Sequence, residues 1–220
     1  MMMSPFSHAD IQTFISTYGY WFIGLVVGIE SMGIPLPGET ALVAAAIYAA
    51  SAPDISIGGV IGAAILGSII GDNIGYSIGR RFGYPLLLKH GHVIGMTEDR
   101  IKLGQYLFMS YGGKIVFIGR FIALLRILAA FLAGVNRMPW FAFLIANATG
   151  AVLWASVFGF GGYLFGELMF EQHDRWGPLI ATGAVAGFFG IGFLLHRYEK
   201  RLVVRAKQAL PGPLESYQSK

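Results

Sequence analysis

Two arginines stand inside one of the most apolar stretches of the chain. Residues 114–131 read KIVFIGRFIALLRILAAF and carry Arg120 and Arg126. An arginine at the centre of a bilayer costs about 2.5 to 3.5 kcal/mol even on lenient insertion scales, so these two need a partner or a purpose. Guanidinium groups stay charged and bind phosphate oxygens in a bidentate fork. The two arginines are therefore predicted to bind the phosphate of an anionic headgroup.

Two glutamates are the candidate partners of these arginines. Glu30 lies at the end of the first apolar segment, and Glu39 stands in the motif PLPGE. Two acids that face two bases neutralise each other. Burial favours a protonated carboxyl group whereas the arginines favour an ionised one, so occupancy of the site can be coupled to protons at Glu30 and Glu39. A purely structural role as ion pairs is the alternative.

The spacing of the arginines sets a condition on the backbone. On an unbroken helix, Arg120 and Arg126 would point about 120° apart with a rise of about 9 Å between them. They can share one ligand only across a bend or at the tip of a hairpin.

Composition indicates an integral membrane protein. Of the 220 residues, 55% are hydrophobic and only 13% are charged, and the mean hydropathy is +0.62, far above that of an ordinary soluble domain. The absence of cysteine excludes disulfides and thiolate metal sites, and we expect no metal and no cofactor. The N-terminal stretch MMMSPFSHADIQTF lacks a basic region, so we expect it to be retained rather than cleaved as a signal peptide.

Apolar segments of two kinds follow one another along the chain. Four are long enough for helices that span a bilayer, at about 20 residues each: 14–33, 56–79, 138–166 and 177–196. Two others, 34–50 and 113–136, are interrupted, the first by Pro35 and Pro37. Because a broken backbone at membrane depth must face protein or a water-filled cavity, both are predicted to be re-entrant hairpins.

The positive-inside rule orients these segments. The net charge of +4 comes from basic residues concentrated after the last apolar segment, which reads as a cytoplasmic tail near anionic lipids rather than a nucleic-acid site. The basic segment 80–112 and Arg137 are then cytoplasmic, Asp54 lies outside, and both termini are inside. The two hairpins consequently enter from opposite faces, as in the inverted repeats of secondary transporters.

The expected fold is an all-α polytopic membrane protein with four full transmembrane helices and two opposed re-entrant hairpins in an inverted repeat. A single membrane domain, 1–220, is expected to contain the following parts: a first span with the outside-entering hairpin (14–55), a glycine-rich span (56–79), a cytoplasmic amphipathic segment (80–112), the cytoplasm-entering hairpin (113–136), the last two spans (138–196) and the basic tail (197–220).

The span 56–79 carries small residues at every fourth position. Gly67, Gly71, Gly75 and Gly79 fall on one helix face, which favours close packing against another helix. Asp72 lies beside this face and is expected to have a partner, because an unpaired carboxylate would not be left in lipid.

Four motifs together resemble those of the DedA family of bacterial inner-membrane proteins, which is related to eukaryotic lipid-scramblase domains. They are ESMGIPLPGE (30–39), GDNIGYSIGR (71–80), GRFIALLR (119–126) followed by AG (133–134), and NATGAVLW (147–154). They occur in the same order as in the family, and the resemblance covers roughly residues 20 to 165. One departure is Ala123, where many members have proline in the bend between the arginines.

This resemblance implies a transport function in the bacterial inner membrane. Some members of the family move undecaprenyl phosphate or phospholipid between leaflets, and others are linked to the proton motive force. The acidic positions of the family fall on Glu30 and Glu39, and its essential arginines on Arg120 and Arg126. Asp72 and Asn147, which stand in the matching motifs, are expected to support them. The implied partners are anionic or polyprenyl-phosphate lipids, protons and a second copy in a homo-oligomer, with no nucleic acid.

Three functions are weighed on these grounds. The first is a carrier that flips an anionic lipid, and the second is a proton-coupled antiporter of small ions or drugs. The third is a membrane organiser without transport. An enzyme is not expected, because Lys114 stands too close to Arg120 for a lipid phosphatase motif.

Overall fold

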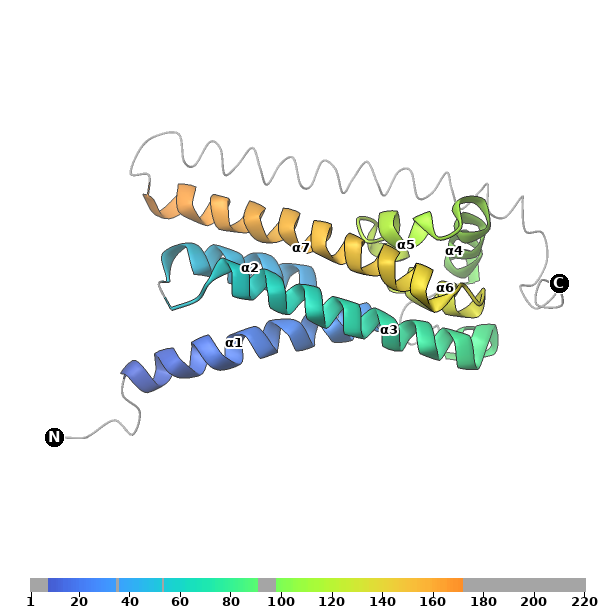
Figure 1. Cartoon of the computed structure of the whole chain (residues 1–220), viewed down its shortest axis with the longest axis horizontal. Coiled ribbons are helices and arrows are strands. Elements are labelled where there is room, and N and C mark those ends of the chain that lie inside the picture. Colours follow the sequence, from blue (N-terminus) through green and yellow to red (C-terminus); the bar gives the residue numbers. More distant parts are fainter. Residues whose placement is uncertain (1–7, 35, 53, 91–97, 172–220) are drawn as a thin grey trace.

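The described part of the protein is entirely helical in its regular structure (Figure 1). The computed structural model describes residues 8–34, 36–52, 54–90 and 98–171. These ranges contain α1 (His8–Ser31), α2 (Gly38–Ser51), α3 (Ile57–His90), α4 (Glu98–Tyr111), α5 (Lys114–Gly119), α6 (Ala123–Val135) and α7 (Trp140–Glu171). The all-α fold class is confirmed, whereas the predicted span 177–196 and the tail 197–220 lie outside the described residues.

Two of the helices in the described ranges are long and apolar enough to cross a membrane. They are Ile57–Gly83 of α3, with 27 residues, and Trp140–Met169 of α7, with 30 residues, and they coincide with the predicted spans 56–79 and 138–166. The indole N–H of Trp140 donates to Asn73 Oδ1 near one end of this pair of helices. At the other end Gly159 of α7 lies against Ile61 of α3. The two long helices are therefore antiparallel neighbours, and the polypeptide leaves helical geometry at Gly83, where φ is 60°.

The first helix runs parallel to α3, and this corrects the predicted topology. Halfway along α1, the hydroxyl oxygen of Tyr20 accepts the backbone N–H of Ser56, the residue before α3, at 2.8 Å. Further along, the backbone of Gly67 meets that of Gly28. The beginning of α1 therefore lies at the same end of the bundle as the beginning of α3, as Figure 1 shows, and Asp54 lies just before α3. A cytoplasmic start of α1 and an external Asp54, both predicted from sequence, are incompatible.

The interrupted segment after α1 is a helical return rather than a complete hairpin. Residues 34–50 were predicted to form a re-entrant hairpin, but Gly38–Ser51 is one helix of 14 residues. Its length of about 21 Å is short of the roughly 30 Å hydrocarbon core. The chain reverses between Ser31 and Gly38, helped by Gly33 at φ 110°. The first hairpin is thus made by α1 and α2 together.

The arginine segment has the bend that its spacing requires. Helix α5 ends at Gly119, Ile122 is extended at φ −120° and ψ 112°, and α6 begins at Ala123. Proline is favoured at the first position of a helix and requires an extended residue before it. The backbone at Ile122 and Ala123 already has this geometry, so the bend forms with alanine in place of proline.

Helices α5 and α6 form the second hairpin. The returning helix of each hairpin, α2 in the first and α6 in the second, packs parallel to one of the two long helices. In α7, Gly162 and Gly166 lie against residues 43–50 of α2, and both helices run in the same direction. In α6, Gly134 lies against Tyr76 of α3, and these helices also run in the same direction. Figure 1 shows α2 in one half of the bundle and α5 and α6 in the other. The two bends therefore approach the middle from opposite ends.

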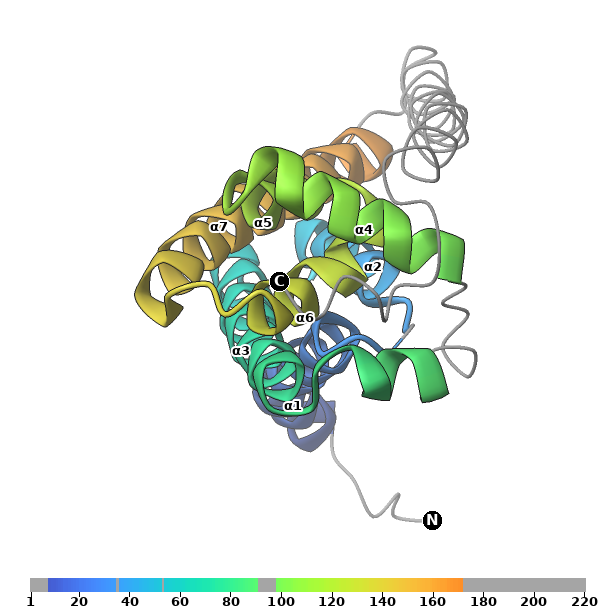
Figure 2. The same ribbon diagram turned by 90° about the vertical axis from the view of Figure 1, so that its right-hand side faces the viewer.

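The glycine face of α3 makes the close helix contacts that its spacing predicts. A Cβ atom at Gly67 or Gly71 would strike the backbone of α1, and one at Gly79 would strike the backbone of Phe131 in α6. One stripe of small residues thus brings both α1 and α6 close to α3. Seen along the long axis in Figure 2, α6 lies near the middle of the bundle, between α3 and α4.

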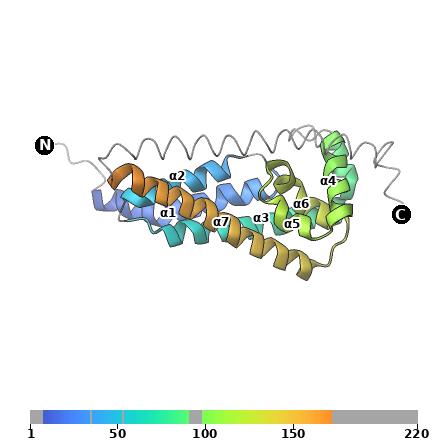
Figure 3. The ribbon, with the colours of Figure 1, turned by 90° about the horizontal axis from the view of Figure 1, so that it is seen from above.

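Helix α4 crosses one end of the bundle (Figure 3). It was predicted to be an interfacial amphipathic helix, and the helix is present. Its apolar residues Ile101, Leu103, Leu107 and Phe108 are buried in the protein, in one cluster with residues of α5 and α6. A reciprocal pair of amide hydrogen bonds at 3.1 Å joins Gln105 to Asn136, the residue that follows α6. The helix therefore secures the second hairpin rather than presenting its apolar face to lipid.

The direction of α1 is open to a direct test, because the chain has no native cysteine. Single cysteines at Asp10, two residues into α1, and at Asp54, before α3, should react with a membrane-impermeant thiol reagent from the same side. Lys114→Cys, at the start of α5, should react from the opposite side. Labelling would be measured on intact and inverted membrane vesicles. If Asp10→Cys reacts together with Lys114→Cys, the parallel arrangement of α1 and α3 is wrong.

Candidate functional site

Arg126 lies in the middle of the bundle between two carboxylates. Its Nη2 donates to Glu30 Oε2 at 2.7 Å, and its Nη1 lies 3.6 Å from Glu39 Oε2. The guanidinium carbon is 4.1 Å from the centre of the Trp154 ring, which is a cation–π contact. Only 5% of the Arg126 side chain is exposed, against 14% for Glu30 and 34% for Glu39. Arg126, Glu30 and Glu39 form a triad, and Glu39 is its most exposed member.

The first hairpin brings the two glutamates together. Glu30 belongs to the last turn of α1 and Glu39 to the first turn of α2, where the helix dipole favours negative charge. Gly38 lies between them in space, since a Cβ atom there would strike the carboxylate of Glu30 and lie 3.2 Å from the Cα atom of Val27. The glycine of the PLPGE motif thus leaves room for the carboxylate of Glu30 beside the start of α2.

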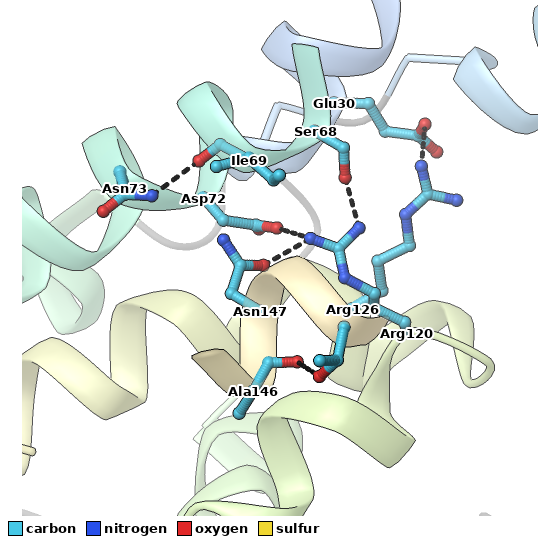
Figure 4. Close-up of polar contacts among 10 residues, drawn as sticks. Glu30, Ser68, Ile69, Asp72, Asn73, Arg120, Arg126, Ala146 and Asn147 are labelled. Atoms are coloured by element: carbon cyan, nitrogen blue, oxygen red, sulfur yellow. Dashed lines mark hydrogen bonds and ion pairs between the residues drawn. The ribbon is translucent and has the colours of Figure 1, made fainter. Parts of the chain in front are cut away.

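Arg120 lies at the bend before α6 and is held by three side chains of the long helices (Figure 4). Its guanidinium group donates to the Ser68 hydroxyl, to the Asp72 carboxylate and to Asn147 Oδ1. Ser68 and Asp72 belong to α3, and Asn147 belongs to α7. All four side chains are buried. Arg120 therefore connects the second hairpin to both long helices.

Gly150 of α7 makes this position of Arg120 possible. A Cβ atom there would lie 3.0 Å from Cδ and 3.4 Å from Nε of Arg120. The arginine side chain consequently lies directly on the α7 backbone, one helical turn from its partner Asn147.

The two arginines differ in the state of their partners. The sequence predicts a shared set of two acids and two bases, but the structure gives Arg126 both predicted glutamates and gives Arg120 a third acid, Asp72. Arg120 is enclosed by protein, whereas Arg126 has a partner that is one-third exposed. Asp72 and Asn147, predicted to be supporting residues, both contact Arg120.

Several buried donors around the two arginines have no acceptor. Within the described residues they are Nε of Arg120, Nε of Arg126, Nδ2 of Asn147 and Nε1 of Trp154, together with the hydroxyl of Ser31, the neighbour of Glu30. The four nitrogen atoms can only donate hydrogen bonds. Buried polar groups are normally satisfied, so the site has a surplus of donors suited to oxygen atoms of an anion or of water.

Ser68 and Trp154 are site residues that sequence reasoning missed. Ser68 precedes Asp72 by four residues and so shares its helix face, which was a usable signal. Trp154 follows Asn147 by seven residues on the same face of α7, inside a matching motif. As for metals, no three His, Asp or Glu side chains in the described ranges are placed to share an ion.

The Arg120 cluster predicts a large effect of removing its acid. Asp72→Ala leaves the buried guanidinium group without its counter-charge, which should lower the free energy of unfolding by about 3 to 5 kcal/mol. The measurement is thermal or chemical unfolding of the purified protein in detergent. Asp54→Ala is the matched control, since Asp54 is exposed and should change stability by less than about 0.5 kcal/mol.

A double variant separates loss of the pair from loss of a single charge. Arg120→Met combined with Asp72→Leu removes both charges and replaces them with apolar side chains, so it should regain most of the stability lost in Asp72→Ala. A double variant as unstable as the single one would show that the ion pair is not the cause.

Comparison with known proteins identifies the family of this chain. Residues 36–164 match the VTT domain. An uncharacterized membrane protein of Mycobacterium tuberculosis is 51% identical over 190 residues, covering 84% of this chain and 86% of that protein. Protein DedA of Escherichia coli is 30% identical over 90% of this chain and 94% of its own length. Undecaprenyl phosphate transporter A of Bacillus subtilis is 30% identical over 72% of this chain and 78% of its own length. No solved structure matches the chain significantly. The chain is therefore a membrane protein of the VTT-domain family, to which DedA belongs.

Proposed function

We propose that the protein is a carrier that moves an anionic lipid, such as a polyprenyl phosphate, between the leaflets of the bacterial inner membrane. The observation that carries the proposal is the Arg126 triad: one buried guanidinium group, two carboxylates from the first hairpin, and neighbouring donors without acceptors. Phosphate oxygens are the acceptors that such a set of donors suits. The similarity to a protein named undecaprenyl phosphate transporter A supports a polyprenyl phosphate as the ligand.

In this mechanism Arg126 exchanges carboxylate for phosphate. The contact with Glu39 is the longer of its two ion pairs, at 3.6 Å, and the more exposed, so the ligand displaces Glu39 first. Trp154 holds the face of the guanidinium group while its edge changes partners. Arg120 keeps its protein partners throughout and positions the bend. The sequence predicts that both arginines bind phosphate, whereas in this mechanism only Arg126 does so.

Charge balance gives the protons their role. With all three groups ionised, Arg126, Glu30 and Glu39 have a net charge of −1. Binding of a phosphate with one negative charge makes the net charge of the site −2, and uptake of one proton by a glutamate returns the net charge to −1. Because uncompensated charge is costly in a low-dielectric site, ligand entry favours protonation, and ligand release favours loss of the proton.

The proposed topology has two re-entrant hairpins that enter from opposite faces. The parallel pairs α2 with α7 and α6 with α3 support an inverted repeat, and the short α2 and α5 support hairpins that do not cross. Basic residues Arg80, Arg81, Lys114 and Arg137 gather at the α4 end, which is therefore assigned to the cytoplasm. Asp54 and the beginning of α1 are assigned to the outside, and the C-terminal tail stays a cytoplasmic prediction.

The first test replaces the fork of Arg126. Arg126→Lys keeps the positive charge but loses the planar bidentate donor, so lipid translocation should fall about 10- to 100-fold, in line with loss of one or two hydrogen bonds to a charged group. Translocation of a fluorescent polyprenyl phosphate would be measured in vesicles that contain only the purified protein. Arg137→Lys, in the exposed turn before α7, is the matched control and should transport normally.

The outcome of this assay separates the competing functions. Normal translocation by Arg126→Lys would mean that Arg126 is only a counter-charge. If the parent protein moves no lipid without partner proteins, the membrane organiser replaces the carrier. An antiporter of small ions or drugs would instead move its solute against a proton gradient in the same vesicles without moving lipid.

The second test concerns the proton. Glu39→Gln removes the charge but keeps the shape, so the variant should remain folded, because Glu39 is one-third exposed and Glu30 still neutralises Arg126. It should bind lipid phosphate, and its translocation should no longer respond to an imposed proton gradient. Thermal stability, binding and translocation across a pH series would be measured. Glu167→Gln, near the far end of α7, is the control, and an unchanged response in Glu39→Gln would remove this residue from the coupling.

A further inference from the structure

The face of α3 that points away from the arginines carries a groove. Its volume is about 470 Å³, within the range of ligand sites. Four isoleucines and Phe82 make its walls largely apolar, and Arg81 stands at one end. Ile70 and Ile74 line the groove and are exposed, whereas Asp72 between them is buried on the opposite face. The groove is therefore separate from the Arg120 and Arg126 clusters.

The polar groups in the groove differ in whether they are free to bind a ligand. The amide of Asn73 donates to the carbonyl of Ile69 and accepts from Trp140, and the Ser77 hydroxyl donates to the carbonyl of Asn73. Arg81 has no carboxylate partner among the described residues. Its guanidinium carbon lies 5.9 Å from the centre of the Phe82 ring. Arg81 is thus the one charged group of the groove with its donors available.

The length of the groove corresponds to one leaflet. Ile69 and Arg81 are twelve residues apart, which is about 18 Å along the helix axis. Half of a hydrocarbon core of roughly 30 Å is about 15 Å. With Arg81 at the level of the headgroups, where long basic side chains extend toward water, the other end of the groove reaches the middle of the bilayer.

We propose that this groove binds a phospholipid with an anionic headgroup, with its phosphate on Arg81 and an acyl chain along the isoleucines. Charge complementarity selects the headgroup, because Arg81 lacks an acid and stands next to another arginine, Arg80. The apolar walls and the leaflet length select a lipid over a free phosphate ion. This site holds a resident lipid on the outside of the bundle and does not depend on the transport proposed for Arg126.

The test uses native mass spectrometry of the purified protein, with phosphatidylglycerol and phosphatidylcholine of identical acyl chains as probes. The parent should retain phosphatidylglycerol in preference to phosphatidylcholine. Arg81→Gln should reduce this preference about fivefold, the equivalent of about 1 kcal/mol for one basic residue at a membrane surface. Ile74→Trp, which fills the groove, should reduce retention of both lipids.

A control variant makes the result specific. Arg137→Asn removes an exposed arginine from the turn before α7, outside the groove, at a left-handed backbone position that asparagine tolerates. It should keep the preference of the parent.

Three results would overturn the proposal. Equal losses in Arg81→Gln and Arg137→Asn would indicate a general attraction of the basic end for anionic lipid. Unchanged retention in Ile74→Trp would place the lipid elsewhere. A lipid-free dimer that Ile74→Trp converts to monomers would show that a second copy of the chain covers the groove.

Discussion

The buried guanidinium group of Arg126 is the constraint on which the arrangement of the bundle depends. A cation in the middle of a helical membrane protein must find its counter-charge inside the protein. An unbroken helix presents about one side chain per turn on a given face. Two carboxylates that are close in sequence can therefore meet one arginine only where the chain reverses direction. The reversal between α1 and α2 places Glu30 and Glu39 at one point, and the bend at Ile122 brings Arg126 to the same point. Broken backbone and buried charge thus require each other here.

Close helix packing is the second half of that requirement. The hairpin bends reach the middle of the bundle only because their helices approach α3 and α7 at backbone contact distance. Gly67 and Gly71 admit α1, Gly79 admits α6, and Gly162 and Gly166 admit α2. Without a hydrophobic driving force between helices in lipid, such contacts supply much of the association energy. The same glycines that hold the helices together therefore also set the depth at which the charges meet.

Sequence reasoning anticipated the charged residues better than their pairing. Glu30, Glu39 and Arg126 were predicted together because charges in apolar segments need partners. The partner of Arg120 was not predicted, because Asp72 is 48 residues away and only the packing of α3 against the second hairpin brings them together. The predicted direction of α1 relative to α3 was wrong for a different reason. The first lysine or arginine of the chain is Arg80, so the positive-inside rule has no information about α1. Its direction had to be derived from counting spans, and the count did not allow for the parallel packing of α1 and α3.

The contrast between the two arginine clusters explains how a site can be both stable and exchangeable. A buried ion pair contributes little net stability relative to apolar packing, but breaking it by removing one partner is expensive. Arg120 is in that situation on every side, because Ser68, Asp72 and Asn147 belong to helices that cannot separate without unpacking the bundle. Arg126 has the same cost toward Glu30, but its contact with the more exposed Glu39 is longer and lies where solvent or a ligand can replace it. A ligand phosphate can therefore compete for one edge of Arg126 while Glu30 and the Trp154 ring hold the rest of the side chain. A fixed cluster beside an exchangeable one allows the charge at the centre to change its partner without loss of the fold.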